Sequence, residues 1–334
     1  MCTAIRFQKH HCYFGRTLDI GKSHAEEVVI LPRRVPFSFR NGKTLSEHFA
    51  VIGTAFVQEG YPLYYDACNE KGLAMAGLNF VGNAAFFREN SEKDNLAQFE
   101  LIPWILMQCA DAEEAKQLLS RCNLTDTPFS AELPTAQLHW IICDRREAIT
   151  VEFVRDGLKI YPNPVGVLTN NPPFPMQLFR LNDFMGLSVR APENSFCKEL
   201  PLAPYSFGMG GLGLPGDTSS QSRFVRAAFH LANARCEEEE EVCVGQFFHI
   251  MDTVAVPFGS CDMGGGEFEI TRYTSCCNLE KGIYYYTTYG NRQISAVELR
   301  RENLDGEELK RFPFVSGERI FYQNGEKEGE NRKK

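Results

Sequence analysis

The chain has 334 residues, of which 43% are hydrophobic and 23% charged, a composition typical of a globular protein with a sizeable core. Its formal net charge of −8 argues against a nucleic-acid-binding surface, which needs a basic patch. No apolar segment with a small-residue cleavage site opens the chain and no apolar run approaches ~18 residues, so we expect neither a secretory signal nor a membrane span.

The first residues, Met1-Cys2-Thr3, contain a candidate nucleophile. Loss of Met1 would leave Cys2 with a thiol and a free α-amino group on the same Cα. A cysteine thiol titrates near ~8.5 and an α-amino group near ~7.7–8.0, so the amine can take the thiol proton before the thiolate attacks an acyl carbon. Because a cysteine at position 2 is incidental in most proteins, this residue alone does not establish catalysis.

Residues 3–7 and 12–14 are short β-like runs that predict a hairpin, and the second strand of this hairpin returns Arg16 and Asp19 towards Cys2. Further strands are predicted in the first part of the chain at 27–32, 49–57, 63–68 and 73–80. Asn79 lies near the end of the last of these, where an asparagine is more often a turn former than a functional residue. Phe86 and Phe87 lie in the loop-like stretch 82–95, as core anchors or as a flap over an apolar ligand.

The middle of the chain predicts helices over 98–109 and 112–122, and a capping box from Asp111 to Glu114 opens the second. Strands are then predicted at 137–143, 148–154, 158–161 and 165–168. The polar stretch 169–173 follows the last strand. It can present amide side chains such as Asn170 at the strand end, although Asn-Asn-Pro-Pro is also simply a good turn.

The last third predicts helices over 175–185, 220–234 and 242–253 and strands over 270–278, 283–288 and 294–299. The glycine-rich stretch 208–216 lacks the lysine of a phosphate-binding loop and the strand context of a dinucleotide site, so we predict a plain loop. Arg223 falls in the first turn of a helix, where the helix dipole disfavours a cation. That position makes it a candidate functional cation, although a surface arginine is the usual interpretation.

Strands and helices come in runs instead of strict alternation, which favours an α+β protein with antiparallel sheets and helices packed on them. No linker divides the chain, so we predict one domain over 1–323 and a polar, disordered tail over 324–334. The 12 cysteines form no C-x-x-C pair and the histidines show no zinc spacing. We therefore expect reduced thiols and no metal or cofactor.

Six stretches in fixed order carry a pattern that is specific when taken together: Met1-Cys2-Thr3, Phe14-Gly15-Arg16-Thr17-Leu18-Asp19, Asn69-Glu70-Lys71-Gly72-Leu73 through Ala76-Gly77-Leu78-Asn79-Phe80, Leu168-Thr169-Asn170, Leu214-Pro215-Gly216-Asp217 with Ser222-Arg223-Phe224, and Tyr273-Thr274-Ser275-Cys276. These stretches resemble the choloylglycine hydrolase family, which includes bile salt hydrolases and penicillin V acylases. The resemblance runs from residue 1 to about residue 310. It implies an N-terminal-nucleophile hydrolase fold, a four-layer αββα sandwich with two packed antiparallel sheets.

The resemblance also implies a role for each matching residue. Cys2 would attack the amide carbonyl through sulfur and use its own α-amino group as the base. Arg16 would lie beside the sulfur, and Asp19 would orient the amine. Asn79 and Asn170 would border the oxyanion hole, and Arg223 would complete the charged cluster. The mature chain would begin at Cys2.

Position 79 points to a substrate class, because bile salt hydrolases resemble this chain in having asparagine there, whereas penicillin V acylases typically carry tyrosine. The implied substrates are glycine- and taurine-conjugated bile salts, whose sterol requires an apolar trough. Candidate wall residues are Phe56, Phe86, Phe87, Phe129 and Leu138. Arg16 and Arg223 are the nearby positive charges for an anionic substrate. A homotetramer is implied, and the missing signal and reduced cysteines predict the bacterial cytoplasm.

Two departures from the family pattern bear on the site. The stretch between Cys2 and Gly15 is slightly shorter than in many members, which alters the hairpin tip. Asn171 stands where serine is frequent, so the assignment of the oxyanion hole to Asn170 over Asn171 depends on register.

Three other functions remain open from the sequence. The first is a related acylase acting on penicillin V or on N-acyl homoserine lactones. The second is a thiol hydrolase that pairs an internal cysteine with His139 or His249. The third is a non-catalytic protein that binds bile acids or similar lipids.

Overall fold

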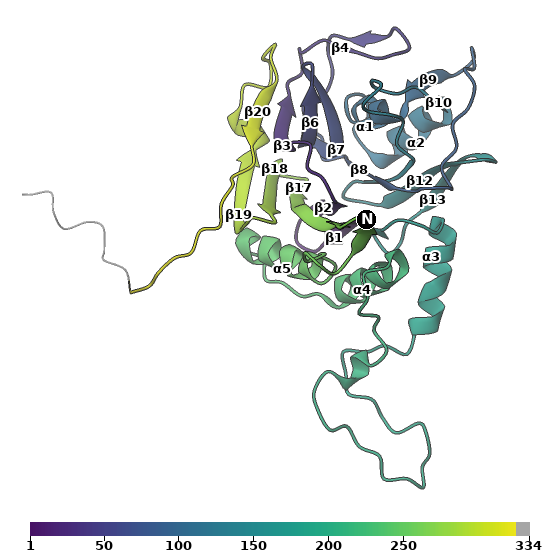
Figure 1. The fold of residues 1–334 in the computed structure, drawn as a ribbon, viewed down its shortest axis with the longest axis vertical. Coiled ribbons are helices and arrows are strands. Elements are labelled where there is room, and N and C mark those ends of the chain that lie inside the picture. The colour runs from purple at the N-terminus through teal and green to yellow at the C-terminus, as the bar shows by residue number, and fades with distance from the viewer. Residues whose placement is uncertain (325–334) are drawn as a thin grey trace, which may run out of the picture.

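The computed structural model describes residues 1–324, and the last ten residues of the predicted tail lie outside this range. Two large antiparallel sheets form the body (Figure 1). The six-stranded sheet contains, in spatial order, β14 (Val167–Leu168), β1 (Cys2–Gln8), β2 (Cys12–Ile20), β17 (Ile270–Asn278), β18 (Ile283–Thr288) and β19 (Asn291–Glu298). The eight-stranded sheet contains β13 (Gly157–Pro162), β12 (Ala148–Val154), β11 (Leu138–Cys143), β8 (Ala74–Asn79), β7 (Tyr61–Asn69), β6 (Val51–Gln58), β3 (Glu27–Leu31) and β20 (Lys310–Pro313).

Helices cover the outer face of each sheet. On the six-stranded sheet, α4 (Ser220–Asn233) packs against β1 and β14, and α5 (Glu240–Asp252) packs against β2 and β17. On the eight-stranded sheet, α1 (Leu101–Leu106) packs against β7 and β8, with α2 (Ala112–Ser120) beside it. The order of layers is therefore helix, sheet, sheet, helix (Figure 1). This arrangement confirms the predicted αββα sandwich.

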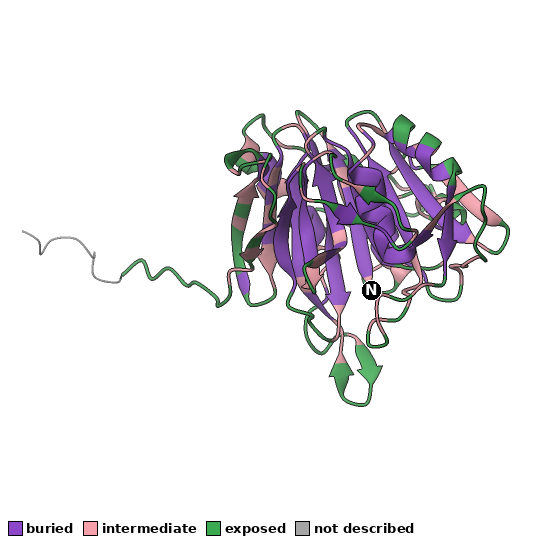
Figure 2. Ribbon diagram, turned by 90° about the horizontal axis from the view of Figure 1, so that it is seen from above, coloured by how far each residue is buried: buried purple, intermediate pink, exposed green. Residues whose placement is uncertain are grey.

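The layering explains the burial pattern of the strands. Residues 2–5 of β1 and residues 12–19 of β2 are buried without interruption. Because the side chains of a strand alternate between the two faces, continuous burial requires that both faces be covered. Figure 2 shows buried residues filling the two sheets and the helices against them.

The predicted strands and helices are largely where the sequence placed them, with shifts of a few residues at their ends. The predicted helix over 98–109 divides into a 3₁₀ turn, η1 (Gln98–Glu100), followed by the short α1. Strand β20 and three small pairs were not predicted: β4 (Phe37–Ser38) with β5 (Thr44–Leu45), β9 (Asp94–Ala97) with β10 (Cys122–Thr125), and β15 (Asp262–Gly264) with β16 (Glu267–Phe268). Within residues 1–324, no helix has the length and apolar character needed to cross a bilayer.

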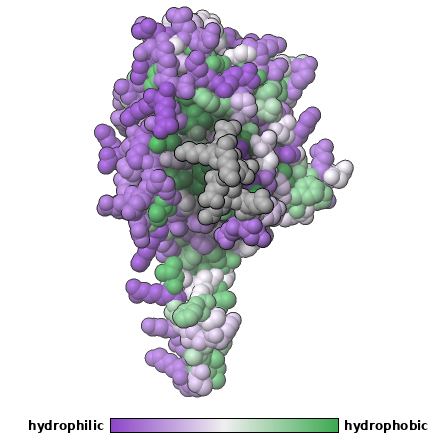
Figure 3. Space-filling view, turned by 90° about the vertical axis from the view of Figure 1, so that its left-hand side faces the viewer, coloured by the Kyte–Doolittle hydropathy of each residue, from purple (hydrophilic) through white to green (hydrophobic). Residues whose placement is uncertain are grey.

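One segment projects from the body. It follows α3 (Phe174–Arg180) and η2 (Leu181–Phe184), runs through η3 (Met209–Gly211), and returns to α4 (Figure 1). We call this segment, residues 185–219, the arm. Figure 3 shows apolar side chains along it below the body. Its most exposed large apolar side chains are Met185, Phe196, Tyr205 and Phe207.

Candidate active site

The register between β1 and β2 brings the predicted charged residues to Cys2. Cys2 pairs with Leu18 and Ala4 with Arg16. Because residues directly opposite each other share a face, Cys2 and Arg16 point towards the eight-stranded sheet. Asp19, one residue beyond Leu18, points to the other face, towards the helices. Arg16 and Asp19 thus approach Cys2 from opposite faces of one sheet.

Arg16 is a buried cation held by backbone carbonyls. Its Nε donates to Thr17 O at 3.1 Å, and its Nη1 donates to Tyr65 O at 3.1 Å and to Gly77 O at 2.5 Å. Its Nη2 is buried and has no hydrogen-bond partner among residues 1–324. Burial lowers the pKa of Arg16, but negative charge on Cys2, Tyr273, Asp66 and Asp19 more than offsets this and leaves the pKa raised. The guanidinium therefore stays charged beside Cys2.

The Tyr65 carbonyl is available to Arg16 because of a β-bulge. The pairing of β6 with β7 passes from Thr54–Asp66 to Ala55–Tyr64, so Tyr65 has no partner residue in the ladder. A bulge residue left out of the ladder can turn its carbonyl to another donor. Here that donor comes from the opposite sheet.

Arg223 is fully buried in the first turn of α4 and contacts the nucleophile through the backbone. Its Nη1 donates to Cys2 O at 2.5 Å and to Thr3 Oγ1 at 2.6 Å, and its Nη2 donates to Asn170 Oδ1 at 2.7 Å. Burial lowers its pKa, while Asp19 and Cys2 act in the opposite direction. The helix dipole disfavours a cation at this position, but hydrogen-bond acceptors from β1 and from the segment after β14 compensate for this by binding the guanidinium.

Asn170 connects Cys2 with Asn79. Its Oδ1 accepts from the Cys2 nitrogen at 2.9 Å, and its Nδ2 donates to Asn79 O at 2.9 Å. The neighbouring Asn171 is exposed, and its Nδ2 donates to Val81 O at 2.8 Å. Asn170, not Asn171, therefore contacts the nucleophile residue. Asn79 ends β8 and lines the same cavity as Cys2.

Asp19 is fully buried, and hydroxyl groups hold its carboxylate. Thr271 Oγ1 donates to Oδ1 at 2.6 Å and Thr17 Oγ1 donates to Oδ2 at 3.1 Å. Burial raises the pKa of Asp19, and Arg223 and the terminal amine oppose that rise. With Met1 in place, the Cys2 nitrogen donates to Asn170, while the Met1 carbonyl accepts from the Asp19 backbone N–H at 3.0 Å.

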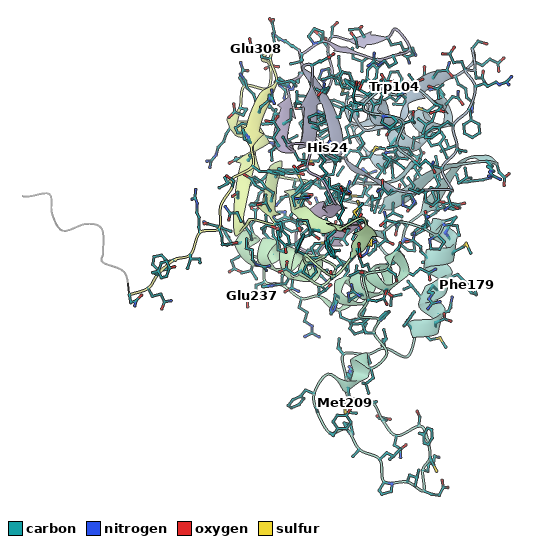
Figure 4. The ribbon with its side chains drawn as sticks, in the orientation of Figure 1. His24, Trp104, Phe179, Met209, Glu237 and Glu308 are labelled. Atoms are coloured by element: carbon teal, nitrogen blue, oxygen red, sulfur yellow. The ribbon has the colours of Figure 1, made fainter. Side chains whose placement is uncertain are left out.

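A largely apolar cavity of about 360 Å³ opens at Cys2. Cys2 itself is 2% exposed and forms one end of the cavity with Arg16 and Asn79. The other walls come from β6, η1, α1, β11 and the 129–136 segment. Three of the candidate wall residues line the cavity: Phe56, Phe129 and Leu138. His24, labelled near the centre of the view in Figure 4, also lines the cavity and is exposed.

Phe86 and Phe87 do not line this cavity. Backbone hydrogen bonds tie their loop to neighbouring strands, from Ala85 N to Phe153 O at 2.8 Å and from Phe87 N to Leu124 O at 2.8 Å. Both side chains are partly buried against the core that lies between the eight-stranded sheet and α1 and α2. They act as core anchors in this structure. An aromatic side chain suits either a core anchor or a flap over an apolar ligand, so the sequence did not separate these two interpretations.

Neither histidine of the alternative thiol mechanism is placed for it. His139 is fully buried and stacks on Phe80 at 4.2 Å between ring centroids. Its ring nitrogens contact Glu152 Oε1 at 3.1 Å and Thr169 O at 2.9 Å, so both are engaged away from any thiol. His249 is exposed on α5.

Several residues that build the site were not identified from sequence. The carbonyls of Tyr65 and Gly77, the hydroxyls of Thr17 and Thr271, and Ser220 Oγ, which accepts from Asn170 N at 2.9 Å, all hold candidate residues in place. Carbonyl groups occur at every position and the hydroxyls belong to ordinary strand residues. The sequence around these groups therefore did not indicate that they hold the site residues in place.

Known proteins resemble this chain over nearly its whole length. Residues 2–312 match the model for linear amide C–N hydrolases of the choloylglycine hydrolase family. A bile salt hydrolase/transferase from Lactiplantibacillus plantarum is 49% identical over 324 residues, covering 97% of this chain and 100% of the relative. A solved structure of conjugated bile acid hydrolase from Clostridium perfringens has a TM-score of 0.90 at 34% identity, covering 97% and 100% of the two chains. Penicillin V acylase from Agrobacterium tumefaciens, at 18% identity and a TM-score of 0.75, shares the fold.

Proposed function

This chain belongs to the choloylglycine hydrolase family of linear amide C–N hydrolases, and on that premise we propose that it hydrolyses glycine- and taurine-conjugated bile salts. The products are the free bile acid and the amino acid. The observation that carries the proposal is the position of Cys2 at one end of a mainly apolar cavity, beside the buried cation Arg16. Such a cavity accommodates a sterol, while its polar end faces the amide.

The reaction divides into two acyl transfers once Met1 has been removed. The Cys2 amine takes the thiol proton, the sulfur attacks the amide carbonyl, and the C–N bond breaks as the ammonium protonates the leaving amine. A thioester then joins the bile acid to Cys2. Water attacks this thioester, the Cys2 amine accepts a proton from the water, and the C–S bond breaks to release the acid and restore the thiol.

Each charged residue has a separate part in this mechanism. Arg16 favours the thiolate because a fixed cation close to a thiol stabilises its charged form. Arg223 fixes the backbone of Cys2 through the Cys2 carbonyl and holds Asn170. Asp19 keeps a negative charge near the ammonium that forms during attack. Arg223 lies behind Cys2 and does not line the cavity, so Arg16 supplies the positive charge that faces the substrate.

Asn79 and Asn170 form the polar border at which the tetrahedral oxygen develops. They are joined by the hydrogen bond from Asn170 Nδ2 to Asn79 O, which sets their spacing. One donor to such an oxygen is typically worth ~2.7–4 kcal/mol at the transition state. Replacing either amide is therefore expected to reduce kcat more than it raises KM.

The test is amine release from glycocholate and taurocholate by the wild type and by Cys2→Ser, with the intact mass of both proteins recorded. We expect loss of one methionine and rapid release of glycine or taurine by the wild type, and a loss of at least ~100-fold in Cys2→Ser. Full activity in Cys2→Ser would remove Cys2 as the nucleophile. A protein that lacks Met1 and cleaves neither bile salt, but cleaves penicillin V, would be an acylase instead. Saturable binding without amine release would indicate a binding protein.

We propose further that the mature chain begins at Cys2, folds as one domain and acts as a homotetramer in the bacterial cytoplasm. The exposed apolar side chains of the arm support self-association, since Phe196 and Tyr205 are 85% and 83% exposed in the single chain. All 12 cysteines are free thiols, which fits a reducing compartment. Size-exclusion chromatography with light scattering measures the assembly directly.

A further inference from the structure

A second buried carboxylate lies behind Arg16, on the side of Arg16 away from Cys2. Asp66 of β7 is 1% exposed and accepts three hydroxyl hydrogen bonds from the six-stranded sheet. Tyr273 OH donates to Oδ1 at 2.5 Å, and Tyr284 OH and Ser275 Oγ donate to Oδ2 at 2.6 and 2.9 Å. The Asp66 carboxylate therefore joins the two sheets directly beneath the site.

The hydrogen bonds around Asp66 are ones that an ionised carboxylate can accept. Ser275 Oγ accepts from Arg16 N at 3.1 Å and donates to Asp66, and Tyr284 OH bonds both Asp66 and Thr54 Oγ1. A carboxylate accepts all three hydroxyls, whereas a carboxylic acid would have to donate one of these bonds. Burial raises the pKa of Asp66, and Arg16 and the three hydroxyls offset only part of that rise.

Arg16 is thus placed between two anionic groups. Its guanidinium hydrogen-bonds carbonyl oxygens only, and the acidic groups that attract it are Cys2, Tyr273, Asp66 and Asp19. Asp66 is not among the residues that line the cavity, so it cannot touch the substrate. Asp66 can therefore affect the reaction by its charge and through its neighbour Arg16, but not by contact with the substrate.

We propose that Asp66 is a positioning residue that sets the acidity of the Cys2 thiol by offsetting part of the charge on Arg16. The inference rests on the proposed role of Cys2 as nucleophile. The two buried arginines favour the thiolate, and Asp19 and Asp66 are the carboxylates that offset their charge. A thiolate of low basicity is a weaker nucleophile, and the optimum lies near the ambient pH. Asp66 keeps the thiol close to that optimum.

Other charged and titratable groups face the same cluster from every neighbouring element. Cys2 is faced by Arg16, Arg223 and Tyr65, from β2, α4 and β7, and Asp19 of β2 faces Arg223 and the terminal amine. Glu269 and Cys261 act on Arg223 from beyond the site. Asp66 is faced by Arg16, Tyr273, Tyr284 and Cys277. All of these groups remain in an Asp66 variant, so a change in the Cys2 titration reports on Asp66 alone.

The experiment measures the pH dependence of Cys2 alkylation by iodoacetamide in wild type and Asp66→Asn. Mass spectrometry of the tryptic peptide Cys2–Arg6 separates this thiol from the other 11. Removal of the negative charge strengthens the effect of Arg16, so we expect the alkylation midpoint to fall by about one pH unit. The acid limb of kcat/KM for glycocholate is expected to move in the same direction. Tyr273→Phe, which removes one donor to the carboxylate, should shift both curves less.

Asp144→Asn is the matched control, since it also removes a buried carboxylate but one that holds the turn before β12 and the start of α2. It should leave the alkylation midpoint unchanged. A midpoint in natively folded Asp66→Asn that stays within ~0.2 units of the wild type, or rises, overturns the inference. If Asp66→Asn does not fold, unmoved midpoints in both Tyr273→Phe and Tyr284→Phe overturn it. Full hydrolysis by Cys2→Ser would remove Cys2 as the nucleophile and the inference with it. A shifted midpoint in a protein that cleaves penicillin V but neither bile salt would refute the proposed substrates and leave the inference standing.

Discussion

At the scale of single residues, the site is built from cations that do not pair directly with carboxylates. Arg16 donates to three carbonyl oxygens, and Arg223 donates to carbonyl, hydroxyl and amide oxygens. Neutral acceptors hold a guanidinium in place without cancelling its charge. Apart from what Asp19 and Asp66 offset from a distance, the field of both arginines therefore remains available to the sulfur and to the developing oxyanion.

The effect of the Arg16 charge on the Cys2 thiol can therefore be measured by substitution. In Arg16→Gln the thiolate loses its nearest cation, so we expect the midpoint of Cys2 alkylation to rise by at least ~1 pH unit. Amine release at neutral pH is expected to fall at least ~10-fold. Arg6→Gln is the control, because Arg6 is on the strand of Cys2 but donates to Asp144 O and Arg145 O and does not line the cavity. Equal alkylation curves in Arg16→Gln and wild type would contradict the assignment.

The residue scale is also where the sequence was most informative. Arg223 was identified from its unfavourable position in a helix, and the structure shows it in contact with the Cys2 carbonyl. The hairpin predicted that Arg16 and Asp19 return to Cys2, and the register agrees. The sequence did not decide between Asn170 and Asn171, because that choice depends on a contact between segments more than 150 residues apart.

At the scale of elements, two β-bulges set the geometry around Cys2. One leaves Tyr65 unpaired on β7 and directs its carbonyl to Arg16. The other leaves Arg272 unpaired on β17, so that Thr271 lies opposite Asp19 and Tyr273 lies opposite Leu18. A one-residue slip exchanges the faces to which side chains point. Thr271 consequently reaches Asp19 on the helix side, while Tyr273 reaches Asp66 between the sheets.

These bulges explain why the strands were predicted from sequence, whereas the hydrogen bonds from Thr271 to Asp19 and from Tyr273 to Asp66 were not. The alternation of apolar and polar residues identifies β17, yet an inserted residue inverts that alternation partway along the strand. Its position depends on the pairing with β2, which is more than 240 residues earlier in the chain. Local sequence patterns hold no information on that pairing.

The β8–β11 pair controls the width of the cavity at Gly77. A Cβ at this position would lie 3.0 Å from Trp140 Nε1 and 3.3 Å from Leu138 Cδ1, and both side chains line the cavity. In Gly77→Ala these neighbours must move into the cavity, so we expect KM for glycocholate to rise about 3–10-fold and Tm to fall. Steady-state kinetics and thermal denaturation measure the two effects. The midpoint of Cys2 alkylation should not change, and a change there would mean that the methyl group had displaced Arg16 instead.

The turn before β12 gives a test of stability against pH. Asp144 accepts from Ala112 N, Arg146 N and Glu147 N at 3.0, 2.6 and 2.9 Å. Burial acts to raise its pKa, but these three donors and Arg6 outweigh burial and leave the pKa lowered. A lowered carboxyl pKa stabilises the fold above the unfolded pKa of about 3.9, and this stabilisation is lost as the pH falls through the folded pKa.

We therefore expect Asp144→Asn to reduce the free energy of unfolding by about 1–2 kcal/mol at pH 7. The difference from wild type should shrink as the pH is lowered below about 4, because the wild-type carboxylate is then protonated. Urea denaturation at a series of pH values measures this. A difference that grows towards acid pH would show that the pKa is raised, not lowered.

At the scale of the whole molecule, the site is assembled by packing of the two sheets. Cys2, Arg16 and Ser275 come from the six-stranded sheet, and Tyr65, Asp66, Gly77 and Asn79 come from the eight-stranded one. The runs of strands and helices predicted an antiparallel α+β fold, and the family resemblance supplied the sandwich. The residues buried at the interface between the sheets followed only from the structure, because facing side chains there have no fixed sequence spacing.

The arm gives a prediction at this scale. Replacing Phe196, Tyr205 and Phe207 together by serine removes exposed apolar side chains without touching the core. We expect light scattering to show a smaller assembly than the wild type forms. The alkylation rate of Cys2 in the dissociated protein should stay within about twofold of the wild type, since the arm does not line the cavity. An unchanged assembly would assign self-association to another surface.

The first residues of this chain lie in the middle of the molecule, as Figure 1 shows. Cys2 is 2% exposed, and its nitrogen faces Asn170 inside the fold. In most proteins the N-terminus can carry an affinity tag, a linker to a solid support or a fusion partner. Here a peptide added before Cys2 would convert the general base into an amide that cannot accept a proton. Biosensors or immobilised catalysts made from this enzyme should therefore be attached through the other end of the chain.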